Sequence, residues 1–419
     1  MLFRSLINLK KKFLIYGYSI SGKSIEKYFI NKKCSYNIYD DYKKIINKKA
    51  ISKKQLLKRI RDYSYFVVSP SIMIEKNHFL YKYKNKILID LDFLSLEISL
   101  QKIIGVTGTE GKSSTCSYLS ETLSKKYNTQ IIGNFGETIL DKKNLNKYLS
   151  NIDVLIIELS SYQLDKLKFL KLHYALITNI FCDHLEYHNN LRNYVSSKFK
   201  IQNLLYEDSY LFLSKKLFLQ YQRFIKIQKK RLILNDEILP SKKDILNYIK
   251  ELNLNSIKKI INKIDSKIKI KNFKFTNDLK FRNQLIYNSA NLKIYNDSKC
   301  TNLNNAIFKN NLLNSNKKIL IIGGKLKKQE IDHKYNIKNT LVLIFGSQNK
   351  IFLNHLNFIN SNYFNFKNLN ELAEFLKLIL KNYKYEYLLF SPGAESFDSY
   401  KNYLDRGKHF NNIIKRALF

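Results

Sequence analysis

Short apolar runs alternate with amphipathic stretches along most of the chain. The first run follows Lys11, and after it come a turn with Gly17 and Gly22 and a helical pattern with one apolar face. Further strands are predicted at residues 36–39, 65–69 and 87–91. Strands that alternate with helices are typical of a parallel sheet covered by helices. Residues 1–97 are therefore predicted to form a first α/β domain.

The same alternation continues through a middle part, residues 98–277, and a last part, residues 278–419. A helix is predicted from Gly111 to about Lys125, and a terminal helix from about Ser399. Residues 214–275 are rich in Lys and Ile, carry Pro240 and offer no motif on which to place a site. The strands predicted in these two parts are 102–107, 154–158, 175–180, 294–297, 319–322, 341–345 and 388–391.

Composition agrees with a folded, multidomain protein. The length of 419 residues suits about three domains, and a hydrophobic content of 45% excludes a disordered chain. The formal net charge is +39, yet only nine of the 73 basic residues are Arg, and the excess of Lys runs the whole length. Nucleic-acid-binding proteins usually cluster their basic residues on one face and favour Arg. We therefore interpret the excess of Lys as drift of the amino-acid composition in an AT-rich genome and expect no specific nucleic-acid partner.

The four cysteines lie far apart without metal-ligand or disulfide spacing, which favours a reducing, cytoplasmic setting. No signal-peptide pattern opens the chain, and no apolar run is long enough for a membrane span. Neither secretion nor insertion into a membrane is therefore expected.

Residues 105–113, Gly-Val-Thr-Gly-Thr-Glu-Gly-Lys-Ser, stand where a predicted strand turns into a helix. Backbone N–H groups and the helix N-terminus would face an anion there. The strict phosphate-loop pattern has glycine at the position of Val106, whereas in this chain the glycine is at position 105, one residue before it. The core is intact, with Lys112 for the β- and γ-phosphates of a nucleotide and Ser113 for Mg²⁺. The sequence therefore predicts a nucleotide phosphate site.

Two other predicted strands end in polar groups. Glu158 ends the strand 154–158, and Asp183 with His184 follows the strand 175–180. A carboxylate at a strand end beside a phosphate loop is suited to Mg²⁺, although each group alone fits an ordinary strand end or helix cap.

Taken in order, the segments TGTEGKS, ELSSYQL, TNI, DHL, NDSKCTN and SPGAESFD resemble the Mur ligases, the ATP-dependent amide-forming enzymes of peptidoglycan precursor synthesis. The resemblance implies a Rossmann-like UDP-binding domain, a central P-loop ATPase domain and a Rossmann-like C-terminal domain. The stretch 296–302 favours the member that joins D-glutamate to UDP-N-acetylmuramoyl-L-alanine through an acyl phosphate. We expect a cytoplasmic monomer that uses ATP and two Mg²⁺ ions.

The resemblance also implies roles for individual residues. The catalytic residues would be Lys112, Glu158, His184, Lys198 and Arg282, and Lys198 would be carbamylated. ATP would contact Gly108, Thr109, Gly111, Lys112, Ser113, Ser114, Asp297 and Asn302. The metal ligands would be Ser113, Glu158, His184 and Lys198. The substrates would contact Ile20, Ser21, Asp40, Ser69, Asn134, Ser160, Gln163, Lys299, Thr301, Lys327, Ser396 and Tyr403.

The chain departs from the family pattern near several expected ligand positions. Glu110 replaces the usual Asn of the phosphate loop, Lys325 and Leu326 replace Asp-Gly, and Glu395 replaces a small residue. Phe281 stands where His is common. Three alternatives remain open: a sibling ligase for another amino acid, a basic nucleic-acid-binding NTPase, and a relative that has lost its activity.

Overall fold

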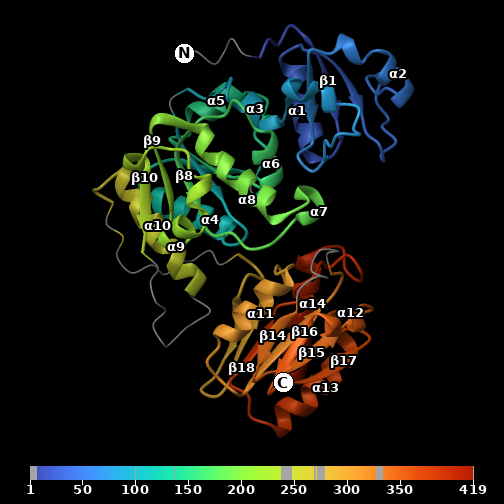
Figure 1. The fold of residues 1–419 in the computed structure, drawn as a ribbon, viewed down its shortest axis with the longest axis vertical. Coiled ribbons are helices and arrows are strands. Elements are labelled where there is room, and N and C mark those ends of the chain that lie inside the picture. Colours follow the sequence, from blue (N-terminus) through green and yellow to red (C-terminus); the bar gives the residue numbers. More distant parts are fainter. Residues whose placement is uncertain are drawn as a thin grey trace. The chain divides into compact units, whose positions relative to one another are not determined.

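The structure is a computed structural model that describes residues 7–99, 101–135, 137–236, 248–268, 270, 279–326 and 334–418. Three main sheets follow one another along the chain, each flanked by helices (Figure 1). They fall in residues 12–88, 102–235 and 284–390. The predicted α/β class is therefore confirmed. The chain forms two compact units: the first holds the first two sheets, and the second holds the third sheet together with residues 181–188.

The first sheet has four strands in the order β2-β1-β3-β4, all parallel. Helix α1 buries Ile25, Tyr28 and Phe29, the apolar face predicted from the sequence. The strands are β1 (Lys12–Tyr16), β2 (Ser35–Tyr39), β3 (Tyr65–Val68) and β4 (Ile87–Leu88), and the helices are α1 (Ile20–Asn31), η1 (Ile60–Asp62), η2 (Tyr81–Lys86), α2 (Lys53–Lys58) and α3 (Asp90–Leu94).

The strand predicted at 87–91 ends early, at Leu88, and α3 begins at Asp90. Asp92 causes this break, because its carboxylate accepts a hydrogen bond from the Ile89 N–H at 2.9 Å and caps the helix. The other oxygen of Asp92 accepts the N–H groups of Lys168 and Phe169, each at 2.8 Å. Asp92 thus links the first sheet to a loop of the second. Burial raises the pKa of its carboxyl to about 6.

Asp92→Ala is expected to lower the free energy of unfolding by about 2–3 kcal/mol, since three backbone N–H groups lose their acceptor. The raised pKa of Asp92 means that the folded protein binds more protons than the unfolded one between about pH 4 and 6. Its contribution to stability therefore falls as pH rises through that window, and the variant lacks this slope. Denaturant unfolding at several pH values measures both effects, with the exposed Asp62→Ala as control.

The second sheet has six parallel strands in the order β10-β9-β8-β5-β7-β6, so that β5 lies centrally. Its strands are β5 (Lys102–Thr107), β6 (Thr129–Gly133), β7 (Val154–Glu158), β8 (Leu172–Ile177), β9 (Leu205–Ser214) and β10 (Leu232–Asn235). The helices of this part are α4 (Lys112–Leu123), α5 (Leu145–Ser150), α6 (Ser161–Lys166), α7 (Leu185–His188), α8 (Leu191–Phe199), η3 (Lys200–Leu204), α9 (Lys215–Tyr221), η4 (Gln222–Phe224), η5 (Lys229–Arg231) and α10 (Tyr248–Ile264).

The stretch 214–275, which showed no motif, includes α9, the edge strand β10 and α10. Helix α10 buries Ile257, Ile260 and Ile261 completely. These residues recur at helical spacing, which explains why an Ile-rich sequence without a motif still forms an ordered part of the first unit.

The third sheet has the order β11-β12-β18-β13-β15-β17, and only the β11–β12 pair is antiparallel. Its strands are β11 (Gln284–Asn288), β12 (Lys293–Asn296), β13 (Lys318–Gly323), β15 (Leu341–Phe345), β17 (Asn362–Phe366) and β18 (Tyr387–Phe390), and a separate pair joins β14 (Tyr335–Lys338) to β16 (Leu356–Ile359). The helices are α11 (Leu303–Leu312), α12 (Asn349–Asn354), α13 (Leu369–Asn382) and α14 (Tyr403–Leu418).

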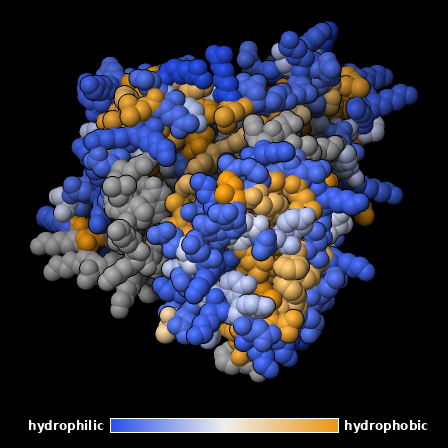
Figure 2. Space-filling view, turned by 60° about the horizontal axis from the view of Figure 1, so that its bottom comes forward, coloured by the Kyte–Doolittle hydropathy of each residue, from blue (hydrophilic) through white to orange (hydrophobic). Residues whose placement is uncertain are grey.

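The terminal helix begins later than predicted, at Tyr403 rather than near Ser399. Asn402 sets this start, because its side-chain oxygen accepts the N–H groups of Leu404 and Asp405 at 2.9 and 3.0 Å. The face drawn in Figure 2 is largely hydrophilic, with apolar residues in separate patches. Among the described residues, every helix is too short or too polar to cross a bilayer.

Candidate active site

A loop of four residues, 108–111, joins the carboxyl end of β5 to α4. Gly108 has a φ of +150°, and a Cβ on it would lie 1.9 Å from the hydroxyl oxygen of Thr178. Gly111 has a φ of +75° and caps the helix. Gly108 therefore requires glycine and the left-handed backbone of Gly111 favours it, which explains the glycines of the predicted phosphate loop. The N-terminus of the 12-residue helix α4 follows directly, as an anion site needs.

Thr178 and Asn179, which follow β8, hold this loop in place. The Asn179 carbonyl accepts the Thr109 N–H at 3.0 Å, and its side-chain oxygen accepts the Glu110 N–H at 2.9 Å. In return, the Glu110 carbonyl accepts hydrogen bonds from the Thr178 hydroxyl at 2.6 Å and the Asn179 amide at 3.1 Å. Thr178 and Asn179 of the TNI segment therefore hold the phosphate loop by hydrogen bonds to the backbone groups of the loop.

Lys112 and Lys198 meet at a single carbonyl group. Their ammonium groups donate to the Gly108 oxygen at 2.9 and 2.7 Å, and Lys112 also donates to Thr109 at 2.8 Å. Lys198 is only 2% exposed and lies 4.6 Å from the centre of the Tyr194 ring. The Tyr194 hydroxyl shares a hydrogen bond of 2.8 Å with Thr109. The structure thus brings together two predicted catalytic lysines that are 86 positions apart in sequence.

Ser113 and Glu158 form an oxygen-rich pair beside the loop. The Ser113 hydroxyl donates to one Glu158 oxygen at 2.5 Å, and the Asn134 amide donates to the other at 2.8 Å. Both Ser113 and Glu158 are almost fully buried. Hydroxyl and carboxylate oxygens are the ligands that Mg²⁺ prefers, so these residues fit the ion implied by the resemblance. Asn134, expected to contact substrate, here donates to the Glu158 carboxylate and orients it.

Ser160 and Gln163 form a capping box at the start of α6. The Ser160 hydroxyl accepts the Gln163 N–H at 3.2 Å, and the Gln163 side-chain oxygen accepts the Ser160 N–H at 2.9 Å. Their side chains therefore already have a structural role at the end of β7. Ser114, another predicted ATP contact, lies in the first turn of α4.

The residues predicted in the first domain gather at the carboxyl ends of β1, β2 and β3. Ser69 donates to the Gly17 carbonyl at 2.9 Å, and Asp40 accepts the Tyr18 N–H at 2.7 Å. Partial burial alone would raise the pKa of Asp40, but backbone N–H donors, including those of Tyr18, Tyr42 and Lys43, outweigh it and lower the pKa. Ile20 is 76% exposed at the start of α1. Ser21 bonds to Asp90.

Sequence reasoning missed a polar cluster beside this turn. The Asp41 carboxylate accepts hydrogen bonds from the hydroxyls of Tyr16 and Tyr39, the latter at 2.6 Å. The Tyr16 hydroxyl also lies 3.2 Å from His78 Nε2. Burial, together with the hydrogen bonds to Asp41, raises the pKa of both tyrosines. Asp41 was adjacent to a predicted residue, but nothing in the pattern around His78 indicated it.

In the second unit, the loop of Arg282 is held on both sides. Its neighbours Phe281 and Asn283 have positive φ values of 61° and 50°, which non-glycine residues rarely adopt. The Phe281 carbonyl accepts the Lys299 N–H at 3.0 Å, and the Asn283 N–H donates to Asp297 at 3.1 Å. The loop of Arg282 is therefore fixed against the segment 297–299.

Asp297 and Asn302, predicted to bind nucleotide, both make internal contacts. The Asp297 carboxylate pairs with Lys309 at 2.7 Å and accepts the Ser391 hydroxyl at 3.0 Å. Asn302 caps α11 and donates its amide to the Cys182 carbonyl at 2.9 Å. Lys309 was missed, because one more lysine in a lysine-rich chain gives no signal. Thr301, which precedes Asn302 in the chain, is half-buried.

His184 has a φ of 54° and precedes α7. Its ring nitrogens lie 3.5 Å from Asp183 and 3.4 Å from Glu186, so two carboxylates orient the imidazole. Lys299 lies 4.5 Å from the centre of the Tyr403 ring. Ser396 is buried, and Lys327 falls outside the described residues.

Two of the departures from the family pattern face each other. Lys325 and Glu395 form an isolated antiparallel bridge, with two N–H···O bonds of 2.9 Å. Two residues of opposite charge are therefore directly opposite each other in the bridge, an arrangement in which each replacement can stabilise the other.

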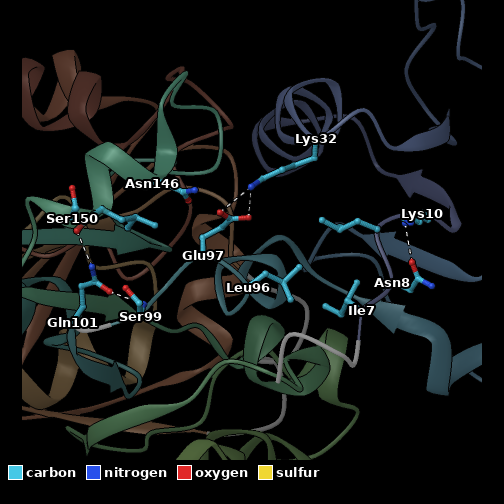
Figure 3. A pocket seen from close by; sticks show the side chains of 12 residues that line it. Ile7, Asn8, Lys10, Lys32, Leu96, Glu97, Ser99, Gln101, Asn146 and Ser150 are labelled. Atoms are coloured by element: carbon cyan, nitrogen blue, oxygen red, sulfur yellow. Dashed lines mark hydrogen bonds and ion pairs between the residues drawn. The ribbon is translucent and has the colours of Figure 1, made fainter. Parts of the chain in front are cut away.

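A further groove lies in the first unit, away from the phosphate loop, and has a volume of about 730 Å³ (Figure 3). Lys32 reaches across it to Glu97, with an N···O distance of 2.8 Å. Gln101 donates to the Leu149 carbonyl at 2.8 Å. Among the described residues that line it, none is a predicted site residue.

The phosphate loop on a central parallel sheet, with a buried hydroxyl–carboxylate pair beside it, defines an α/β protein of the P-loop nucleotide-binding class. A model of the Mur ligase middle domain matches residues 106–234. A UDP-N-acetylmuramoylalanine–D-glutamate ligase of Prochlorococcus marinus is 31% identical in an alignment of 407 positions that spans 87% of this chain and 84% of that one. The chain belongs to the Mur ligase family.

Other comparisons agree with this membership. A ligase of the same name from Fusobacterium nucleatum is 28% identical in an alignment of 451 positions that spans 97% of this chain and all of that one. The crystal structure of MurF ligase from Thermotoga maritima in complex with ADP aligns over 98% of both chains, with a TM-score of 0.57 and 12% identity. At that identity the likeness supports the three-part fold alone.

Proposed function

We propose that this chain joins D-glutamate to UDP-N-acetylmuramoyl-L-alanine in the cytoplasm, acting as a monomer and converting ATP to ADP and phosphate. The observation that carries the proposal is the agreement among relatives: those that cover most of the chain at 27–31% identity bear the name of that ligase. The phosphate loop and the buried Ser113–Glu158 pair support the ATP-dependent chemistry.

Amide synthesis from a carboxylate needs a leaving group, because a carboxylate is a poor electrophile. In the proposed reaction, the terminal alanine carboxylate attacks the γ-phosphate of ATP, the bond from the γ-phosphorus to the bridging oxygen breaks, and ADP leaves as the acyl phosphate forms. The D-glutamate amine then attacks the acyl carbon, and phosphate leaves from the tetrahedral intermediate. The protein contributes mainly position and charge, as in other phosphoryl transfers.

Lys112 and Arg282 are the proposed partners of the transferred phosphoryl group. Lys112 already lies at the phosphate loop, where its ammonium group donates to the carbonyls of Gly108 and Thr109. Arg282 lies in a loop that is held by hydrogen bonds of its neighbours Phe281 and Asn283 with the segment 297–299. Gly108, Thr109, Gly111 and Ser114 would surround the phosphates, while Asn302 and Asp297 would order the nucleotide side of the second unit.

Ser113 and Glu158 would hold Mg²⁺, and His184 with Lys198 would hold a second ion. Bound magnesium would neutralise charge that builds up on the phosphate oxygens. An unmodified Lys198 opposes a cation, whereas carbamylation makes it an anion: its amine adds to CO₂ and loses a proton. The buried position of Lys198 at the loop supports this assignment.

The substrate assignments follow the two units. The uridine and sugar-peptide side would involve Ile20, Ser21, Asp40, Ser69, Asn134, Ser160 and Gln163, and the D-glutamate side would involve Lys299, Thr301, Lys327, Ser396 and Tyr403. Asn134 donates to Glu158, and Ser160 and Gln163 cap the helix that follows Glu158. We propose that these three residues hold the segment around Glu158 in the position in which it meets the substrate.

ADP formation tests the proposal. With ATP, Mg²⁺ and UDP-N-acetylmuramoyl-L-alanine, we expect D-glutamate to start turnover, while L-glutamate and D-alanine leave it at background. Turnover with another amino acid only would favour a sibling ligase. Stimulation by RNA that falls steeply with salt would favour a nucleic-acid-dependent NTPase.

Glu110→Asn tests whether the acidic residue in the phosphate loop weakens ATP binding. The contacts described for Glu110 with Thr178 and Asn179 use backbone atoms of residue 110, so the loop should keep its shape. Removal of a negative charge beside the phosphates should lower the KM for ATP by about threefold to tenfold, most strongly at low salt. An unchanged KM together with full activity in the native chain would show that Glu110 is harmless.

A further inference from the structure

Arg406 is a fully buried arginine, with 0% exposure, in the first turn of α14. The pattern of residues around Arg406 predicts no role for it. Arginine is almost never fully buried unless it is paired. Its contacts therefore need a reason beyond packing.

The guanidinium of Arg406 binds neutral oxygens from three segments. It donates to the Ser298 hydroxyl at 3.2 Å and the Ser298 carbonyl at 2.8 Å. It also donates to the Ala394 carbonyl at 3.0 Å and approaches the Gly323 carbonyl at 3.5 Å. One planar group thus joins the carboxyl ends of β12, β13 and β18, which are neighbours in the third sheet. A flat fork with fixed donor directions is suited to this, and a single ammonium is not.

Each joined segment leads in sequence to a predicted amino-acid-binding residue. Ser298 precedes Lys299, Gly323 lies four places before Lys327, and Ala394 lies two places before Ser396. Lys325 and Glu395, which depart from the family pattern, lie within the last two of these stretches. Arg406 contacts the carbonyls of Gly323 and Ala394, and the Lys325–Glu395 bridge joins the same two segments one or two residues further along. Ser298 also donates its hydroxyl to the Tyr403 carbonyl at 2.9 Å, which ties in the start of α14.

The next residue, Gly407, extends this arrangement to the loop of Arg282. A Cβ at Gly407 would lie 2.4 Å from the Phe281 ring, so the ring packs directly on the helix backbone. Phe281 in turn accepts the Lys299 N–H. The Arg406–Gly407 pair therefore contacts four loop segments that carry predicted ligand residues.

A contribution to the stability of the fold does not readily explain a buried arginine at this position. Within the described part of the chain, the Arg406 guanidinium forms no ion pair, and burial lowers its pKa to about 10 although the more distant carboxylates of Asp398 and Asp297 act to raise it. It stays charged at neutral pH, and a buried charge among neutral acceptors costs free energy.

We propose that Arg406 is a positioning residue for the amino-acid substrate: it sets the relative placement of the loops that begin at Ser298, Gly323 and Ala394, and so sets the affinity for D-glutamate. This inference rests on the proposed function. It predicts a split in the kinetic constants, because the UDP-linked substrate is assigned to the first unit and the amino acid to the second.

Arg406→Lys keeps the charge but loses the fork. It should raise the KM for D-glutamate by about tenfold to a hundredfold, while the KM for the UDP substrate changes by less than about twofold. Ser298→Ala, which removes one acceptor, should raise the KM for D-glutamate by about threefold; if Arg406→Lys fails to fold, this variant decides. Arg416→Lys, at an exposed position of the same helix, is the matched control.

Amide hydrogen exchange gives a readout that needs no substrate. Arg406→Lys should speed exchange at the Lys325 and Glu395 amides of the bridge and leave the amides of the first sheet unchanged. If both KM values stay at wild-type levels, or if kcat alone falls in proportion to lost folded protein, the proposal is overturned. A wild-type protein without D-glutamate-dependent turnover overturns the proposed function instead, and exchange then still decides whether Arg406 holds the loops.

Discussion

Lys112→Met lowers kcat by about 10²–10³-fold, because the phosphate loop loses the cation expected to stabilise charge on the transferred phosphoryl group. In the structure, its ammonium lies against the carbonyls of Gly108 and Thr109. Those two contacts are backbone-only and lie within the loop, whose shape also depends on Gly108, Gly111 and the Thr178–Asn179 clamp. The variant should therefore fold and keep its affinity for the UDP substrate. Steady-state kinetics with each substrate varied in turn measures this.

Lys125→Met is the matched control for Lys112→Met, because Lys125 is exposed just beyond the end of α4. It should retain wild-type rates. A Lys112→Met protein that turns over at more than about a tenth of the wild-type rate would contradict the phosphate role of this lysine.

Lys198→Met is expected to lower kcat by about a hundredfold through loss of the carbamate proposed to hold metal. Methionine has a similar length and apolar character, so it should fill the buried space beside Tyr194 without loss of folding. Removal of CO₂ should also lower the wild-type rate, and added bicarbonate should restore it. The variant should respond to neither treatment.

Lys200→Met separates this effect from a general loss of positive charge. Lys200 is 41% exposed, two positions further along, and pairs with Asp165. With ¹³C-labelled bicarbonate, a carbamate signal should appear in the native protein and in Lys200→Met but be absent from Lys198→Met. A native protein without this signal, whose rate is independent of CO₂, would rule out carbamylation at this site.

The phosphate loop and the strand ends were predictable because local sequence determines them. Gly108 and Gly111 adopt backbone conformations that favour glycine, and the apolar runs of β5 and β7 end at Thr107 and Glu158. Parallel strands then bring these ends to one edge of the sheet. This geometry explains why Ser113 and Glu158, far apart in sequence, meet in the fold.

Side-chain contacts between distant segments were not predictable from a single sequence. Asp92 ends a predicted strand early by capping Ile89, and Asn402 delays the last helix, although both are ordinary polar residues in the pattern. Arg406 depends on three carbonyls that converge only after the third sheet has formed. In a chain with 73 basic residues, neither Lys309 nor Arg406 stands out by type.

The most direct test of the proposed ligase activity is mass-spectrometric detection of the product after incubation with ATP, Mg²⁺, UDP-N-acetylmuramoyl-L-alanine and isotope-labelled D-glutamate. The account predicts one new amide that carries the label, formed together with an equal amount of ADP and absent when L-glutamate or D-alanine replaces D-glutamate. ADP formation without a labelled amide, or an amide formed equally well with the other amino acids, would contradict it.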